Sequence, residues 1–157
     1  MKKIYLISIG LALIFWPTDL YAYPEPQEDR TIINSSTMAR KLVGKHKLNL
    51  QWIGSDNWEE FGNLKVTNLQ GTMFVRGTQT KEDDYLQIDG KIVNIEDKQF
   101  TFQGKIITRV SHINKGQSCK RDGEMIFKIT ENRKYWRLQQ MQSPCDTATD
   151  YVDIFMR

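Results

Sequence analysis

The feature that most constrains the fold of this chain is a two-residue alternation of apolar and polar side chains. It starts at His46, where Leu48, Leu50 and Trp52 alternate with polar neighbours. Because successive side chains of a β-strand point to opposite faces, this period predicts strands with one buried face. The same period recurs near Leu64–Val66, Thr72–Arg76, Tyr85–Ile95, Phe100–Val110, Met125–Ile129, Tyr135–Met141 and Val152–Met156.

About eight short strands with mostly short connections predict an all-β fold and an antiparallel meander. Such strands close into a single up-and-down β-barrel, which leaves no sheet edge exposed; a β-sandwich is the alternative. Gly90 and Gly104 lie inside the longest strands, where glycine marks bulges or bends. The final strand has bulky residues on both faces, which indicates a central or closing position. The stretches Gly77–Asp84 and His112–Asp122 are expected to be loops.

The first 22 residues have the layout of a bacterial secretory signal peptide. Lys2 and Lys3 precede an apolar run from Ile4 to Trp16, and the small residue Ala22 supplies a cleavage site. The run is shorter than the roughly 20 apolar residues of a membrane-spanning helix; an uncleaved anchor is the alternative. We expect cleavage after Ala22, a periplasmic or secreted mature protein and no stable membrane insertion.

The mature chain of about 135 residues has the size of one domain. Residues 23–44 are expected to form a polar tail, loose or disordered as far as Asn34, and then a short helix from Thr37 to Val43. Ser35 and Ser36 can cap this helix and Gly44 ends it; plain loop is the alternative. Residues 45–157 form the predicted barrel domain.

Two cysteines, Cys119 and Cys145, lie in the mature part of the chain. In an oxidising compartment a pair of cysteines usually forms a disulfide. The enclosed loop of about 25 residues would stabilise the fold by about 3 to 3.5 kcal/mol in the chain-entropy model. A zinc site needs four ligands, and only His46 and His112 are available to complete one. We therefore predict a structural disulfide and no metal site.

The charge balance of the chain is nearly even. It has 22 Lys and Arg against 19 Asp and Glu, and the leader's Lys2, Lys3 and Asp19 account for part of the difference. Because the cations form no long run, composition gives no support to binding of nucleic acid or of an anionic membrane. We expect a monomer without a nucleic-acid partner.

Catalysis finds little support in the sequence. Ser111, His112 and Asp122 can be drawn as a triad, but no GxSxG nucleophile elbow accompanies them. The acidic pairs Glu59-Glu60 and Asp83-Asp84 lie in predicted loops and are typical of a solvated surface. No calcium loop or phosphate-binding glycine loop is present. We predict that the protein has no catalytic residue, binds no cofactor and is not an enzyme.

The aromatic residues are the better functional indication. Trp58 lies in a polar stretch where no core pattern requires it, so it is a candidate ligand or partner contact; a Trp folded over the barrel as a lid is the alternative. Tyr135 and Arg137 are further candidates on one strand face. Arg137 can point into the barrel and bind an anion, or lie on the outer face and pair with a carboxylate such as Asp153.

The C-terminal part of the chain resembles a group of small uncharacterised secreted bacterial proteins. The resemblance is carried by Arg133–Gln139, Pro144–Asp146 and Asp150–Ile154, and it implies no activity. In architecture the chain is also similar to lipocalin-like barrels and to periplasmic lysozyme inhibitors. It lacks the lipocalin Gly-x-Trp, because no glycine stands two residues before Trp52, and it lacks the Ser-Gly loop of the inhibitors.

Two functional hypotheses follow. In the first, the barrel binds a small apolar or amphipathic ligand of the envelope in a cavity lined by Leu50, Ile88, Phe102 and Phe127. In the second, the protein is an interaction or inhibitor module that contacts another envelope protein through its loops. The first requires an open interior, and the second requires a packed interior with an exposed patch around Trp58.

Overall fold

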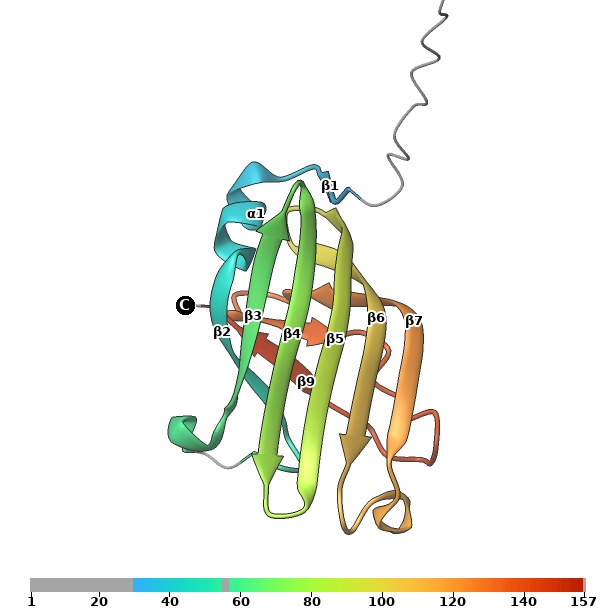
Figure 1. Cartoon of the computed structure of the whole chain (residues 1–157). Coiled ribbons are helices and arrows are strands. Elements are labelled where there is room, and N and C mark those ends of the chain that lie inside the picture. The colour runs from blue at the N-terminus through green and yellow to red at the C-terminus, as the bar shows by residue number, and fades with distance from the viewer. Residues whose placement is uncertain (1–29, 55–56, 157) are drawn as a thin grey trace, which may run out of the picture.

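Nine strands and one α-helix form the part of the chain that the computed structural model describes, residues 30–54 and 57–156 (Figure 1). Two short 3₁₀ helices, η2 (Trp58–Glu60) and η3 (Asn114–Gly116), lie in connections. The main elements are β1 (Ile32–Ile33), α1 (Ser36–Leu42), β2 (Gly44–Leu50), β3 (Gly62–Leu69), β4 (Thr72–Lys81), β5 (Asp84–Ile95), β6 (Gln99–Arg109), β7 (Cys119–Lys128), β8 (Tyr135–Leu138) and β9 (Val152–Phe155).

Strands β2 to β9 form a closed antiparallel barrel. Each strand pairs with the next along the chain, and β9 returns to pair with β2, with Leu48 opposite Ile154. The predicted eight-stranded up-and-down barrel is therefore confirmed, and the alternative of a sandwich is not adopted. The closing position predicted for the last strand is also confirmed, because β9 lies between β8 and β2.

The interior of the barrel is filled by side chains. Leu50, Ile88, Phe102 and Phe127, the four residues expected to line a cavity, are each at most 1% exposed. A side chain that faced a ligand-sized cavity would keep exposed surface toward it. The rings of Phe100 and Phe127 stack with centroids 5.2 Å apart, so aromatic packing contributes to this core.

The segment before the barrel is more ordered than the sequence suggests. The predicted short helix is confirmed as α1, and the Ser35 hydroxyl caps it by accepting a hydrogen bond from Met38 N. Residues 30–34, expected to be loose, include β1, which pairs in parallel with β5. The buried Thr31 hydroxyl donates to Ile92 O and accepts from Met73 N, and these bonds hold the segment against the barrel.

Two expected loops are shorter than predicted. Strand β4 continues to Lys81, and β7 already starts at Cys119. In β4 the polar Gln79 occupies an inward position, where its side-chain carbonyl accepts from Leu50 N. Because the inward residue is polar and Gly77 precedes it, the apolar period disappears from the sequence although the strand goes on.

Gly90 and Gly104 lie directly opposite each other on β5 and β6. A Cβ on Gly104 would collide with Asp89 O and would lie 2.7 Å from the ring of Phe102. The two glycines therefore permit close contact of the strands beneath an inward aromatic ring. The register is regular at both glycines, and the register shift of this strand pair lies between Ile92 and Asn94 instead.

The predicted leader and its cleavage site lie outside the described residues, as does most of the predicted tail. Within residues 30–54 and 57–156, no helix combines the length and the apolar character that crossing a bilayer requires.

Candidate functional site

Trp58 is one end of a continuous row of aromatic rings on the outside of the barrel. It is 47% exposed, and its ring centroid lies 5.2 Å from that of Phe61 and 5.3 Å from that of Phe155. Phe155 is an outward residue of β9, and its ring lies 5.2 Å from that of Tyr135 on β8. These contacts connect Trp58 with Tyr135, two residues that are far apart in the sequence.

Arg137 continues the row. Its guanidinium carbon lies 5.2 Å from the ring centroid of Tyr135 and 4.2 Å from that of Tyr151, within the range of cation–π attraction. Tyr151 is 38% exposed and forms the other end of the row. We call Trp58, Phe61, Phe155, Tyr135, Arg137 and Tyr151 the aromatic face.

Arg137 lies on the outer face of the barrel rather than pointing into it. Its neighbours in β8, Trp136 and Leu138, are fully buried, so Arg137 between them points outward. Arg137 Nε and Nη2 each donate to Asp153 at 2.7 Å. This pair of hydrogen bonds raises the pKa of Arg137 and fixes its guanidinium plane.

Hydrogen bonds from Gln51 hold Tyr151 in place. The Gln51 side chain accepts from Tyr151 N and donates to Thr149 O, both at 2.6 Å. The neighbouring Asp150 is nearly buried and accepts from Trp52 Nε1 at 3.0 Å. One end of the aromatic face is therefore anchored by the segment that follows β2.

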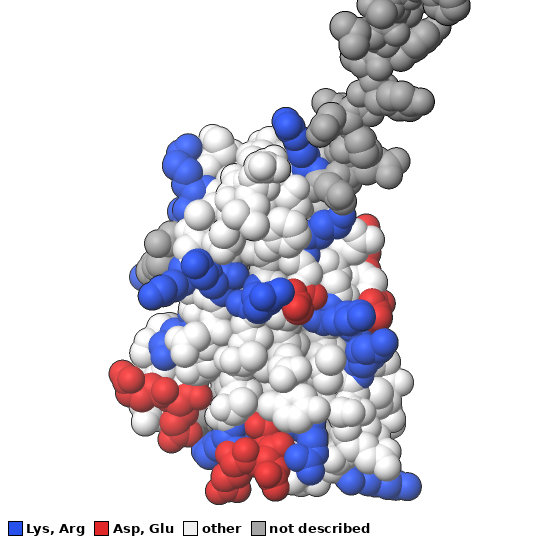
Figure 2. Space-filling view, in the orientation of Figure 1, with Lys and Arg blue, Asp and Glu red and all other residues white. Residues whose placement is uncertain are grey.

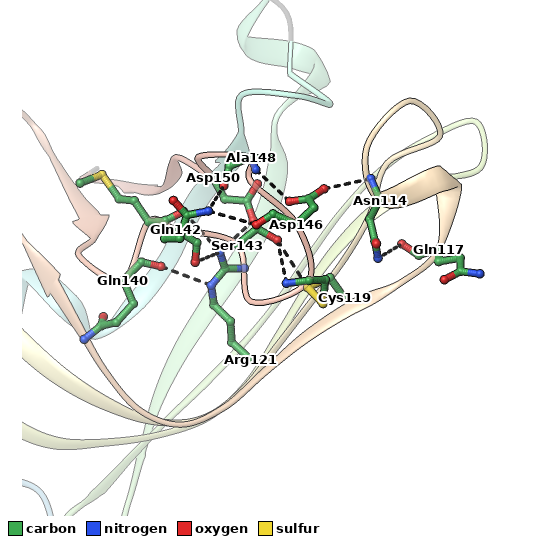
Figure 3. Close-up of a disulfide and its surroundings, with 12 residues drawn as sticks. Asn114, Gln117, Cys119, Arg121, Gln140, Gln142, Ser143, Asp146, Ala148 and Asp150 are labelled. Carbon is green, nitrogen blue, oxygen red and sulfur yellow. Dashed lines mark hydrogen bonds and ion pairs between the residues drawn. A yellow bond between two sulfur atoms is a disulfide. The ribbon is translucent and has the colours of Figure 1, made fainter.

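The predicted disulfide is present and lies at the base of the C-terminal segment (Figure 3). Cys119 and Cys145 have Cα atoms 5.9 Å apart, so the bond joins the first residue of β7 to the connection before β9. Beside it, Arg121 donates to Gln140 O, Met141 O and Gln142 O and to the Asp150 carboxylate. The disulfide and this guanidinium together fix the chain that leads into Tyr151.

Asp146 reinforces the same connection. Its carboxylate accepts from Ala148 N at 2.9 Å and from Asn114 N at 3.0 Å. These bonds, the one from Ala148 first, lower the pKa of Asp146. The connection is therefore tied to the loop before β7 as well as to β7 itself.

His46 supports Phe155 from inside the barrel. Its ring nitrogens lie 3.0 Å from Phe155 O and 2.6 Å from Leu42 O, and its ring meets that of Trp136 edge-on at 5.7 Å. The side chain is nearly buried. It therefore links the end of α1 to the end of β9, beneath the aromatic face.

Ser111, His112 and Asp122, which the sequence allows as a triad, have other partners. The Ser111 hydroxyl donates to Asp84 at 3.3 Å, the His112 ring packs against Trp52, and Asp122 pairs with Lys120. Among the described residues, no group of three or more His, Cys, Asp and Glu side chains is placed to hold a metal ion.

The structure brings together all three residues that the sequence indicated, and it adds residues that sequence reasoning missed. Phe61, Phe155 and Tyr151 complete the aromatic face, and Arg121 anchors it. The sequence could have indicated Arg121. It is separated by even numbers of residues from the inward Met125 and Phe127 of β7, so it points to the same face of the strand. Phe155 directly follows the inward Ile154 in β9, so it points outward.

Comparison with known proteins places this architecture in a family. A model of the PM1083 family matches residues 30–156, which span the barrel, α1 and the aromatic face. The chain belongs to the PM1083 family. A relative from Pasteurella multocida (strain Pm70), described as "Uncharacterized protein PM1083", is 39% identical over 155 residues and covers 98% of both chains. The predicted resemblance to a group of uncharacterised bacterial proteins is thereby confirmed for this PM1083 family member. No solved structure matches it.

Proposed function

We propose that this PM1083 family member is exported to the bacterial envelope and binds another protein there through the aromatic face. The observation that carries the proposal is the continuous row from Trp58 to Tyr151, with Arg137 placed between two tyrosine rings. Trp, Tyr and Arg are the residue types that contribute most of the binding energy at protein interfaces. The proposed role is a binding role rather than an enzymatic one.

The rigidity of the face supports this proposal. Its strands belong to a closed barrel, and its C-terminal end is held by a disulfide and by the ion pair of Arg121 with Asp150. A pre-ordered surface loses little conformational freedom on binding. Exposed rings on such a surface therefore retain more of their contact energy than rings on a mobile loop.

The chemistry of the face indicates what the partner offers. Asp153 already neutralises Arg137, so the partner needs no acidic group at this position. Arg137 Nη1 makes no hydrogen bond with the described residues, and it can donate to a backbone carbonyl of the partner. The proposed partner surface is apolar opposite Trp58 and presents carbonyl oxygens opposite Arg137.

The filled interior favours this role over a ligand-binding barrel. An apolar ligand inside would have to displace Phe102 and Phe127, which are fully buried and in edge contact with each other. Export is supported by the cationic and apolar leader and by the disulfide, a bond typical of oxidising compartments.

A quantitative affinity capture from envelope extract tests the proposal. The mature protein, Trp58→Ala and Tyr151→Ala serve as baits, and Phe74→Ala, which removes an exposed ring elsewhere on the barrel, is the matched control. We expect a protein that wild type and Phe74→Ala retain and that both aromatic-face variants lose. With that protein purified, Trp58→Ala should raise the dissociation constant at least about tenfold. Equal capture by all four baits would refute the proposal.

A further inference from the structure

A row of three cations crosses the outer face of the barrel over β2, β3 and β4, and it begins one strand from Phe155. Lys45 on β2 lies opposite Lys65 on β3, which lies opposite Arg76 on β4. All three are exposed. Side chains in such positions are about 5 Å apart at Cβ, and like charges there destabilise a sheet. The row therefore has no evident role in folding.

Little acidic charge balances this row. Arg76 pairs with Asp89 at 3.4 Å, with both side chains mostly in solvent. Lys45 and Lys65 form no ion pair with described residues. The exposed acids Glu59, Glu60, Glu82 and Asp83 lie in η2 and in the β4–β5 turn. Figure 2 shows a band of basic residues across the middle of this face, with a few acidic residues within it and along the right-hand side, and the largest acidic cluster near the lower end.

Exposed apolar side chains lie beside the cations, toward the β3–β4 turn. Phe74 and Leu69 are 43% and 58% exposed, and they line a shallow groove of about 820 Å³ together with Lys45, Lys65 and Arg76. The exposed residues Ile32 and Ile33 of β1 adjoin the same turn, because Thr31 N donates to Gly71 O. We call Lys45, Lys65, Arg76, Leu69 and Phe74 the basic face.

The order of these groups along the strands matches the layers of a membrane surface. Phe74 lies two residues beyond Arg76, or about 7 Å toward the end of the barrel, and Leu69 lies four residues beyond Lys65, or about 13 Å. Interfacial side chains penetrate roughly 5 to 10 Å below the headgroups. With the apolar tip inserted, the cations lie at the level of the lipid phosphates, and the acidic residues of η2 and of the β4–β5 turn point away from the bilayer. The exposed Glu96 and Asp97 of the β5–β6 turn lie at the inserted end, beside β1.

We propose that the basic face docks this protein on a bilayer surface that contains anionic phospholipid. The ammonium groups of Lys45 and Lys65 and the guanidinium of Arg76 bind phosphate oxygens, while Phe74 and Leu69 enter the acyl boundary. This surface is distinct from the aromatic face, so the docking does not depend on the proposed protein partner.

Vesicle flotation with the mature chain, residues 23–157 with the disulfide intact, tests this proposal. We expect binding to phosphatidylcholine vesicles that contain phosphatidylglycerol, weak binding to pure phosphatidylcholine, and release as salt is raised. Absence of binding to the anionic vesicles would overturn the proposal.

Three variants locate the binding surface. Lys65→Glu should lower the partition coefficient by about fivefold for each unit of charge changed. It should not unfold the barrel, because it separates Lys45 from Arg76 with an opposite charge. Phe74→Ser keeps the charge and should reduce binding severalfold by removing the inserted ring. Lys120→Glu makes the same change of net charge on β7, three strands around the barrel from Arg76.

The comparison of these variants decides between docking and general attraction. Lys120→Glu should retain binding within about twofold, because salt screens charges beyond about 8 Å. Equal losses in Lys65→Glu and Lys120→Glu would mean that net charge alone draws the protein to the vesicles. That result, or unchanged binding in Lys65→Glu or in Phe74→Ser, would contradict the proposed surface.

Discussion

Arg121 donates a hydrogen bond from Nη2 to Asp150 Oδ2 across 2.9 Å, and the two side chains are only 6% and 4% exposed. The same guanidinium holds three successive backbone carbonyls of the connection before β9. A single cation of β7 therefore organises a segment that has little regular structure of its own. Because Tyr151 follows Asp150, the aromatic face depends on this buried pair.

Arg121→Met should lower the free energy of unfolding by about 3 to 5 kcal/mol, since it leaves the buried Asp150 carboxylate without its cation. Urea unfolding followed by tryptophan fluorescence measures this change. Arg76→Met is the matched control, because its ion pair with Asp89 is exposed and should contribute less than about 1 kcal/mol. Similar losses in the two variants would show that the buried pair has no special role.

Removal of the disulfide should destabilise the fold by about 3 kcal/mol, given that 26 positions separate its cysteines. The double variant Cys119→Ala with Cys145→Ala, compared with wild type under oxidising conditions, gives this difference in denaturant. The barrel should remain, because its strands pair without the bond, and the far-UV circular dichroism should be retained. Loss of the β-sheet signal in the double variant at low temperature would contradict this expectation.

Asp146 should make the stability depend on acid pH. Hydrogen bonds from Ala148 N and Asn114 N lower its folded-state pKa below the ordinary value of 3.8. A depressed pKa gives a stabilising contribution that is complete above the unfolded pKa and disappears as pH falls through the folded one. Asp146→Asn should therefore be less stable than wild type at about pH 6, with a difference that shrinks below pH 3.8. A difference that stays constant with pH would argue against this role.

Gly104→Val should cost about 1 to 3 kcal/mol or more, because any Cβ there meets the facing strand and the ring of Phe102. The exposed neighbour Gln103 supplies the control, since Gln103→Ala should change stability by about 0.5 kcal/mol or less. Thermal unfolding of both variants checks this pair of expectations. A Gly104→Val protein as stable as wild type would show that β5 and β6 need no close approach at this point.

The barrel could be predicted from the sequence because its inward residues are nearly all apolar. Where an inward residue is polar, the predicted strand boundaries were wrong. The inward Gln79 accepts a hydrogen bond from Leu50 N and donates one to Asn49 Oδ1. Strand β4 therefore continues through a stretch that the sequence predicts to be a loop. Arg121 breaks the period of β7 in the same way, since its inward guanidinium donates from Nε and Nη2 to carbonyls of a distant connection.

The candidate surfaces show a different limit of sequence reasoning. Trp58 was recognisable because no core pattern required it, but its contact with Phe155 depends on how β9 closes the barrel. The basic face was not visible at all, because Lys45, Lys65 and Arg76 are far from one another along the chain and meet only through strand register. A search for runs of charge along the sequence therefore misses charged surfaces whose residues come from different strands.

The most direct test of the protein-binding role is site-specific photocrosslinking in the cells that make the protein. A photoreactive phenylalanine analogue replaces Trp58 or Tyr151 in the full chain, and replacement of Phe74 is the control on the basic face. The account predicts the same discrete protein adduct from positions 58 and 151 and no such adduct from position 74. Absence of an adduct at both aromatic-face positions, or an identical adduct at all three, would contradict it.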